Sequence, residues 1–392
     1  MMGDLVHNIW RSERVVLLTL PVFAGLMTVL ASECRASAQD PAPAASSQSG
    51  SNSCVKTDSN VPVGQTAATG RISIQVVVSD KQGHPVAGLQ ASDFTLLDNK
   101  QAQKLVGFRA IDHDTLRTDP VHVVIVVDMI NTGFDTVARE RQELATFLKE
   151  DGGELANPTS IAIFADSGVK VAKGSSQDGN ALLEAFNKSQ SELRIIGRNS
   201  GFYGAADRLQ MSLSQLGQLA AFEATQPGRK MILVISPGWP LLARAGDESD
   251  LKQRNWVFNS IVQFTNGLRE ANIQLYCLDP FDLGRTNPFY YEGYRKGVSA
   301  LKDATYPNLA LQVLAEHSGG QVIINGRDIS GELNTAVRDA SVSYELTFEA
   351  VPGDRPNEYH ALQVQVDKPN ITVHTNSGYY ARTSAPMQLN PR

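Results

Sequence analysis

The chain has 392 residues, of which 42% are hydrophobic and 19% are charged, which is the composition of a globular protein with room for two or three domains. Asp and Glu outnumber Lys and Arg by 41 to 35, so the formal net charge is −6 at pH 7. A nucleic-acid-binding protein presents a basic face to the phosphate backbone. This charge balance excludes nucleic acid as the expected partner.

Residues 1–38 have the pattern of a secretory signal peptide. Two arginines precede an apolar run over residues 15–30, and Ala36-Ser37-Ala38 follows as a small-x-small cleavage motif. We expect export to the periplasm, the cell surface or the medium, with cleavage after Ala38. The alternative is an uncleaved membrane anchor, for which the apolar run is slightly short.

Residues 39–70 form a predicted flexible linker. They are rich in Pro, Ala, Ser, Gly and Gln and hold too few large apolar residues to offset the entropy of ordering. Cys54 lies in this linker, whereas Cys277 lies in an apolar run typical of a strand. We therefore expect no disulfide between them, and no Cys/His spacing indicates a zinc site.

Residues 71–112 are predicted to form an N-terminal β-module. Apolar residues alternate from Ile72 to Val78, which is the period of a half-buried strand. The segments 93–97 and 103–108 indicate two further strands, separated by turn residues. Three strands alone bury little core.

Residues 120–341 carry the pattern of a doubly wound α/β domain. Four unbroken apolar runs favour parallel strands buried on both faces. Amphipathic helical periodicity separates them, and Gly319-Gly320 ends one of the helices before a short strand. The four runs are VHVVIVVD ending at residue 128, SIAIFAD ending at residue 166, KMILVIS ending at residue 236 and IQLYCLD ending at residue 279.

Residues 342–382 return to strand alternation, and residues 383–392 form a tail. Three strands are predicted over 344–348, 362–366 and 371–373. Because neither β-flank is large enough alone, we expect residues 71–112 and 342–382 to pair into one β-sandwich that flanks the inserted α/β domain. Two separate small β-modules are the alternative.

Several segments resemble one known family. The motifs VVVSDKQGHPVAGLQASDFTLLDN, VVIVVDMINT, LAEHSGG, YELTF, VQVDKP and SGYYAR are similar to those of the von Willebrand factor A (VWA)-related proteins of acidobacteria. The resemblance covers residues 72 to 382. It implies a VWA-like fold in an exported protein, and it implies no catalytic activity.

The resemblance also implies where a metal-ion-dependent adhesion site would lie. In the wider superfamily an Asp-x-Ser-x-Ser loop, a Thr and a second Asp hold a divalent cation with oxygen ligands. Here Asp128 and Thr132 match the first loop, Ile130 replaces a hydroxyl ligand, and Asn131 is the available substitute.

The other two loops of that site also depart from the family pattern. Ser200 stands near the position of the Thr, and Ser236-Pro237-Gly238 replaces a Ser-Asp-Gly sequence and so removes the second carboxylate. We therefore expect a degenerate adhesion site at Asp128, Asn131 and Thr132, with no cofactor. Binding of Mg²⁺ or Mn²⁺ is the less favoured alternative.

Aromatic residues gather in the loops expected at the carboxyl edge of the sheet, where open α/β sheets bind ligands. Two interpretations are open. The rings form a contact surface for an extracytoplasmic protein, peptide or glycan, or they pack the loops onto the domain. The residues are Phe202, Tyr203, Trp239, Phe289, Tyr290, Tyr291, Tyr294 and Arg295.

The sequence lacks the local signatures of common enzymes. It has no GxSxG, P-loop, HExxH or GxGxxG motif, and one SxxK match, from Ser299 to Lys302, lacks its companion motifs. We expect a non-catalytic interaction or adhesion-type module, with membrane contact only through an uncleaved N-terminal segment. The alternatives are a structural or assembly component of the cell envelope and, with less support, a hydrolase.

Overall fold

The computed structural model describes residues 70–190, 201–242, 251–280, 291–324 and 328–382. All of them belong to the second of two compact units, Gln65–Arg392. The predicted signal peptide, linker and C-terminal tail lie outside the described residues. In the part that is described, no helix is both long enough and apolar enough to cross a membrane.

A six-stranded sheet forms the centre of the α/β part, with the strand order β10-β9-β8-β5-β6-β7. Its neighbouring strands pair in parallel, except that β7 pairs antiparallel with β6 at one edge. The bounds are β5 (His122–Asp128), β6 (Glu154–Ala165), β7 (Gly168–Asp178), β8 (Lys230–Ile235), β9 (Ile273–Leu278) and β10 (Val322–Ile323).

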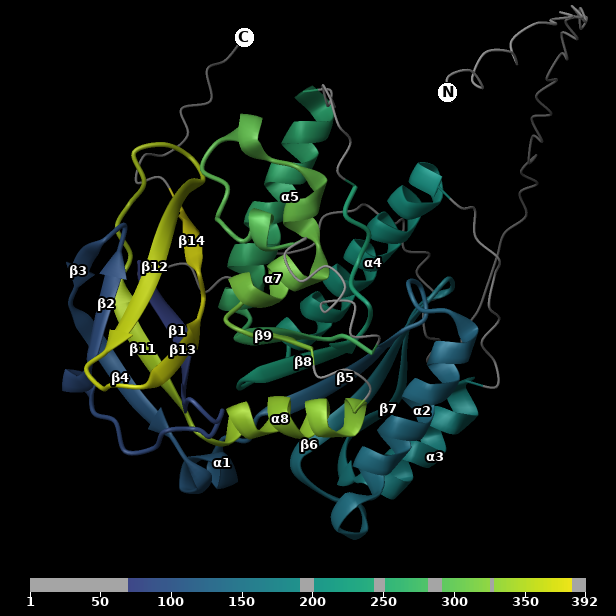
Figure 1. The fold of residues 1–392 in the computed structure, drawn as a ribbon. Coiled ribbons are helices and arrows are strands. Elements are labelled where there is room, and N and C mark those ends of the chain that lie inside the picture. The colour runs from purple at the N-terminus through teal and green to yellow at the C-terminus, as the bar shows by residue number, and fades with distance from the viewer. Residues whose placement is uncertain (1–69, 191–200, 243–250, 281–290, 325–327, 383–392) are drawn as a thin grey trace, which may run out of the picture. The chain divides into compact units, whose positions relative to one another are not determined.

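Helices cover both faces of this sheet (Figure 1). The side chains of β5 alternate between the two layers: Val124 and Val126 pack beneath α4, α5 and α7, whereas Val123 and Val127 pack against α2, α3 and α8. This two-sided burial explains the unbroken apolar run in the sequence. The helices are α2 (Phe134–Lys149), α3 (Gly179–Gln190), α4 (Gly201–Ala224), α5 (Leu251–Glu270), α7 (Leu311–His317) and α8 (Ile329–Ser341).

Two four-stranded antiparallel sheets are built from the segments that flank the α/β part. Their orders are β13-β1-β11-β4 and β14-β12-β2-β3. Each sheet mixes the two flanks, since β1 pairs with β11 and β2 with β12. The bounds are β1 (Arg71–Asp80), β2 (Phe94–Asp98), β3 (Gln101–Gln103), β4 (Leu105–Ile111), β11 (Ser343–Glu349), β12 (Glu358–Val366), β13 (Ile371–Thr375) and β14 (Gly378–Ala381).

One apolar cluster contains residues of both antiparallel sheets. Ile74 and Phe348 come from the first sheet, and Leu96 and Val364 from the second. The chain leaves these sheets after β4, forms α1 (His113–Thr118) and the α/β part, and returns at β11. The exit and the return are neighbours, because Ile111 pairs with Ser343.

The mostly parallel α/β sheet expected from the sequence is confirmed, but three strands were not predicted. The strands β7, β3 and β14 are polar or short, so they lack the apolar periodicity by which strands are recognised. The strand expected over 103–108 begins instead at Leu105. Short 3-10 turns cover Ala91–Asp93, Glu150–Gly153, Glu292–Tyr294, Leu301–Asp303 and Tyr306–Leu309.

Candidate functional site

The carboxyl edge of the parallel sheet contains the point where the strand order reverses. From β5 the chain winds outward through β6 and β7, and it then resumes on the other side at β8. The crevice between the first strands of the two halves is where ligands of such sheets bind. Asp128 ends β5 and Ser236 follows β8, so both residues stand at this crevice.

The Asp128 carboxylate is closed off by its own hydrogen bonds. One oxygen accepts the backbone N–H groups of Ile130 and Asn131, at 2.9 and 3.1 Å. The other accepts the Asn131 amide and the Ser236 hydroxyl, both at 2.8 Å. Asp128 is fully buried, and burial raises its pKa while these hydrogen bonds partly offset that rise.

The residues around Asp128 do not fit a divalent cation. Asn131 uses its amide hydrogens on Asp128 and Ser212, so it presents its NH₂ group to the carboxylate, and NH₂ is not a metal ligand. Ile130 packs into the apolar cluster. The Asn131 carbonyl and the Thr132 hydroxyl have no partner among the described residues. A cation at Asp128 would compete with the hydrogen bonds that its two oxygens already accept.

A second buried carboxyl group lies near Asp128 on helix α2. Glu140 is fully buried, and neither of its oxygens has a hydrogen-bond partner within the described ranges. Burial and, next, the charge of Asp128 raise the pKa of Glu140 well above its ordinary value, against the attraction of Arg139. Burial and the neighbouring charge of Asp128 thus both disfavour the ionised form of Glu140. Across the described residues, no group of three or more His, Cys, Asp or Glu is arranged to hold a metal.

The aromatic contact surface expected at this edge is corrected at two positions. Trp239 is 2% exposed and Tyr291 is 7% exposed, and both belong to apolar clusters. Tyr294 is half-buried against the Tyr291 cluster, and Arg295 pairs with Glu316. These side chains pack the loops onto the domain because that removes large apolar rings from water.

Of the other residues expected on this surface, only Tyr203 has a described side chain. Tyr203 is 81% exposed near the start of α4. The side chain of Phe202, together with Phe289, Tyr290 and Ser200, lies outside what the structure describes.

Two large apolar residues that the sequence did not single out are exposed on helix α5. Leu251 begins helix α5 and is 64% exposed, and Trp256 lies on the same helix and is 43% exposed. Helices α4 and α5 contact each other and both begin at the carboxyl edge of the sheet. We call Tyr203, Leu251 and Trp256 the edge residues.

In the interactions of the described residues, neither Ser236 nor Ser299, the serine of the SxxK match, is hydrogen-bonded to a histidine or lysine. The Ser236 hydroxyl donates to Asp128 and not to a histidine. Ser299 and Lys302 are exposed beside a 3-10 turn rather than on a helix. The motif search by sequence therefore found no nucleophile that the structure supports at this edge.

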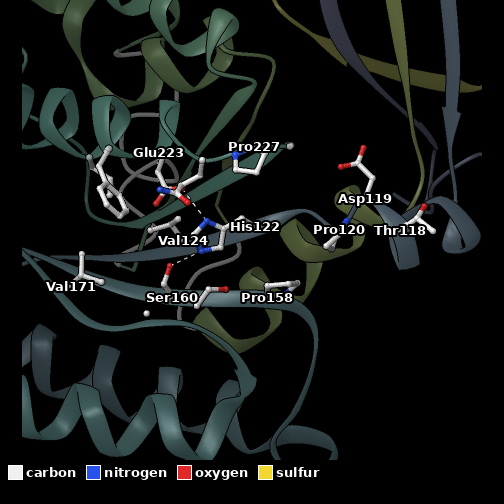
Figure 2. Close-up of a pocket in the computed structure, with 16 residues that line it drawn as sticks. Thr118, Asp119, Pro120, His122, Val124, Pro158, Ser160, Val171, Glu223 and Pro227 are labelled. Atoms are coloured by element: carbon white, nitrogen blue, oxygen red, sulfur yellow. Dashed lines mark hydrogen bonds and ion pairs between the residues drawn. The ribbon is translucent and has the colours of Figure 1, made fainter. Parts of the chain in front are cut away.

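A polar cluster that sequence reasoning missed lies at the opposite, amino edge of the sheet. His122 bonds to Ser160 on one side and Glu223 on the other, and all three line a cavity of about 510 Å³ (Figure 2). The three residues come from β5, β6 and α4. Because no two of them share a local motif, the only sequence signal was a histidine at the start of an otherwise apolar strand.

Comparisons with known proteins give no family assignment. No family model matches the chain, and no curated protein matches it. The solved structures that it resembles include the VWA domain of SpRpn10, at 12% identity over 40% of this chain and 74% of that one, with a TM-score of 0.23.

Two further structures resemble more of this chain but are themselves longer. Human COPII-coat protein Sec24c matches at 8% identity over 68% of this chain and 44% of its own, with a TM-score of 0.29. The pilus adhesin SpaC from Lactobacillus rhamnosus GG matches at 11% identity over 74% of this chain and 48% of its own, with a TM-score of 0.30. The chain thus spans less than half the length of these two proteins, and scores this low carry no conclusion about function.

Proposed function

We propose that this protein is an exported interaction module that binds a protein, peptide or glycan at the carboxyl edge of a VWA-like domain, without a metal ion and without catalysis at that edge. Export rests on the signal-peptide pattern of residues 1–38. The assignment to VWA-related proteins of the acidobacterial type rests on the sequence motifs.

The strand order supports the VWA-like assignment. Counted along the chain from β5, the sheet has the doubly wound order 3-2-1-4-5-6, with one antiparallel edge strand and helices on both faces. We likewise infer that the two antiparallel sheets form one β-sandwich into which the α/β part is inserted. Their shared apolar cluster supports this inference.

The exposure of the edge residues carries the proposal. Large apolar side chains at 81%, 64% and 43% exposure offer apolar surface, and a partner that covered it would remove that surface from water. They occur at the edge where doubly wound sheets bind ligands. Asp128, in contrast, offers no open oxygen for a cation-mediated contact. Apolar contact is therefore the favoured mode of binding.

A structural or assembly role in the cell envelope is the second candidate. Val106 is 42% exposed on β4, and β4 is an edge strand of its sheet. An edge strand with unpaired backbone groups is a template for pairing with another copy. Mass that increases with protein concentration in light scattering would favour this candidate.

The binding proposal is tested by capture of cell-envelope proteins and by a glycan array, using the full chain and two matched variants. The first variant is Tyr203→Ala with Leu251→Ser, and the control is Val106→Ser with Val351→Ser, which removes two exposed apolar groups elsewhere. We expect the first variant to lose a specific set of ligands that the control retains. Equal binding by both variants would refute the role of this edge.

The same capture in EDTA and in excess Mn²⁺ tests metal independence. We expect no change in binding, and no rise in the thermal unfolding midpoint with Mg²⁺, Mn²⁺ or Ca²⁺, because a cation that bound the folded state would raise it. A cation-specific rise that Asp128→Ala abolishes would restore a metal-dependent adhesion site.

A further inference from the structure

The cavity at the amino edge of the sheet combines apolar side chains with a hydrogen-bonded polar cluster. Val124, Leu219 and Phe222 belong to its lining, together with His122 and Ser160. Phe222 is 55% exposed, so an apolar side chain borders the cavity in contact with water. Apolar surface beside convergent polar groups is a common feature of small-molecule sites.

The three polar side chains form a continuous hydrogen-bonded line. The Ser160 hydroxyl oxygen lies 2.8 Å from His122 Nε2, and His122 Nδ1 lies 3.0 Å from the Glu223 carboxylate. Figure 2 shows the imidazole between the two partners. Both distances are within the range for hydrogen bonds between a nucleophile, its base and the group that orients the base.

The chemistry of the partners fixes the direction of proton donation. An ionised carboxylate only accepts hydrogen bonds, so Nδ1–H donates to Glu223, and Nε2 then carries the lone pair that accepts the Ser160 proton. The positive charge of Lys230 lies close enough to interact favourably with the Glu223 carboxylate. His122 is thereby held in the tautomer that a general base toward Ser160 requires.

The fold holds these residues firmly. Ser160 pairs with Val124, two residues after His122, so both polar side chains point to the face that α4 covers. The His122 backbone N–H donates to the Arg229 carbonyl at 2.9 Å. Ser160 and Glu223 are buried at 4% and 1% exposure, which restricts their rotamers.

The neighbouring strand β7 has a bulge opposite Ser160. Thr159 pairs with Ser176 and Ile161 with Lys173, so two residues of β7, Gly174 and Ser175, face Ser160 alone. The described ladder assigns them no partner on β6, and both line the cavity. Bulged residues keep N–H groups outside the ladder and recur next to active sites.

We propose that Ser160, His122 and Glu223 form an acyl-transfer site for small esters with an apolar acyl group. Ser160 Oγ attacks the ester carbonyl and forms a new C–O bond while its proton passes to His122 Nε2. The bond to the alcohol then breaks, and the departing oxygen takes that proton. Water then attacks the acyl-serine while its proton passes to His122 Nε2. The bond to Ser160 Oγ breaks, the carboxylic acid leaves, and His122 returns the proton to Ser160 Oγ.

Each residue has a defined role in this site. Ser160 and His122 are the catalytic residues, and Glu223 is a positioning residue that acts through His122. We assign the developing oxyanion to the backbone of the bulge at Gly174 and Ser175, which lies opposite Ser160. The site lies at the end of the strands opposite the edge residues, so it is independent of the proposed binding function.

The first experiment maps covalent labelling of the full chain by a fluorophosphonate probe with mass spectrometry. We expect one adduct, on Ser160, that is absent in Ser160→Ala and in His122→Gln and unchanged in Ser299→Ala. An adduct elsewhere, or none on Ser160 when a serine esterase labels fully under the same conditions, would overturn the proposal. Both of these contradicting results are observed with the wild-type chain, so they do not depend on whether a variant folds.

The second experiment measures hydrolysis of p-nitrophenyl butyrate. We expect Ser160→Ala to remove turnover, and Glu223→Gln to lower kcat about 10²-fold with KM and the thermal unfolding midpoint unchanged. If Glu223 had only a structural role, Glu223→Gln would lower the thermal unfolding midpoint and would not lower kcat selectively with KM unchanged. Turnover that persists in Ser160→Ala would also refute the assignment.

Discussion

Two buried carboxyl groups near the same strand end differ in how the protein accommodates them. Asp128 receives four hydrogen bonds, whereas Glu140 receives none within the described residues. A buried charge is costly unless hydrogen bonds or a counter-charge compensate it. Donors compensate Asp128, whereas burial and the charge of Asp128 raise the pKa of Glu140 and so disfavour its charged form. Residue type alone therefore does not determine the charge of this edge.

The buried carboxyl group of Asp339 predicts that the free energy of unfolding depends on pH. Burial raises its pKa to about 7, although it accepts a hydrogen bond from Gln321 at 2.7 Å. A raised pKa in the folded state adds stability that is complete below about pH 4, the range of an unfolded Asp, and is lost as pH rises through 7. The variant Asp339→Asn has no carboxyl group to ionise at this position, so it does not lose this stability as pH rises. Urea unfolding should show the variant more stable than wild type by roughly 3–4 kcal/mol at pH 7.5.

The comparison with wild type isolates the contribution of Asp339, because other titrating groups are common to both proteins. At pH 4 the two unfolding free energies should be nearly equal. Parallel pH profiles for the variant and the wild type would show that Asp339 titrates normally.

At the scale of elements, the connection between α7 and β10 depends on close backbone approach. A Cβ on Gly320 would lie 2.0 Å from the carbonyl oxygen of Leu275 in β9. That atom belongs to the central sheet and cannot move away cheaply. We expect Gly320→Ala to lower the free energy of unfolding by about 2–4 kcal/mol.

Gly293→Ala is the matched control, since no atom lies within 4 Å of a Cβ built there. Chemical denaturation of both variants measures the difference. Equal stability of the two would mean that the helix can shift away from β9.

The elements were predictable where burial imposes a period on the sequence. The runs that form β5, β8 and β9 are buried on both faces, and their apolar composition follows from that burial. The edge strand β7 reads GVKVAKGSSQD and has half its positions toward solvent and a bulge, so neither period nor composition marks it. Edge strands and bulges depend on tertiary neighbours that sequence patterns do not show.

At the scale of the whole molecule, the α/β part is an insertion between two paired strands. The antiparallel sheets keep an apolar cluster of their own, composed only of their strands and connections. We expect residues 71–111 joined to 343–382 by a short loop to unfold cooperatively as a separate protein, since Ile111 and Ser343 are already neighbours. Circular dichroism melting measures this.

A non-cooperative melt of the joined fragment would show that the sheets depend on the α/β part. The contact of Tyr380, whose hydroxyl donates to the Val298 carbonyl at 3.1 Å, is the first candidate for such dependence. The variant Tyr380→Phe in the full chain tests that contact alone.

The site was less predictable than the fold, because it depends on which distant residues meet. Along the chain, Ser160 lies 38 residues after His122, and Glu223 lies 101 residues after it. Trp239 and Tyr291 lie in loops by sequence, and only packing shows that they are buried. Family motifs located Asp128, but its hydrogen bonds, rather than its position, decide whether it binds a cation.

The insertion also determines how the molecule carries mechanical load. In the ladder, Arg71 pairs with Glu349 at one end, while Val76 pairs with Tyr344 at the other end, next to Ser343 and Ile111. A force applied between Arg71 and the α/β part therefore pulls β1 and β11 lengthwise past each other. Their backbone pairs then share the load and must break together rather than one after another, which favours resistance to extension at the junction.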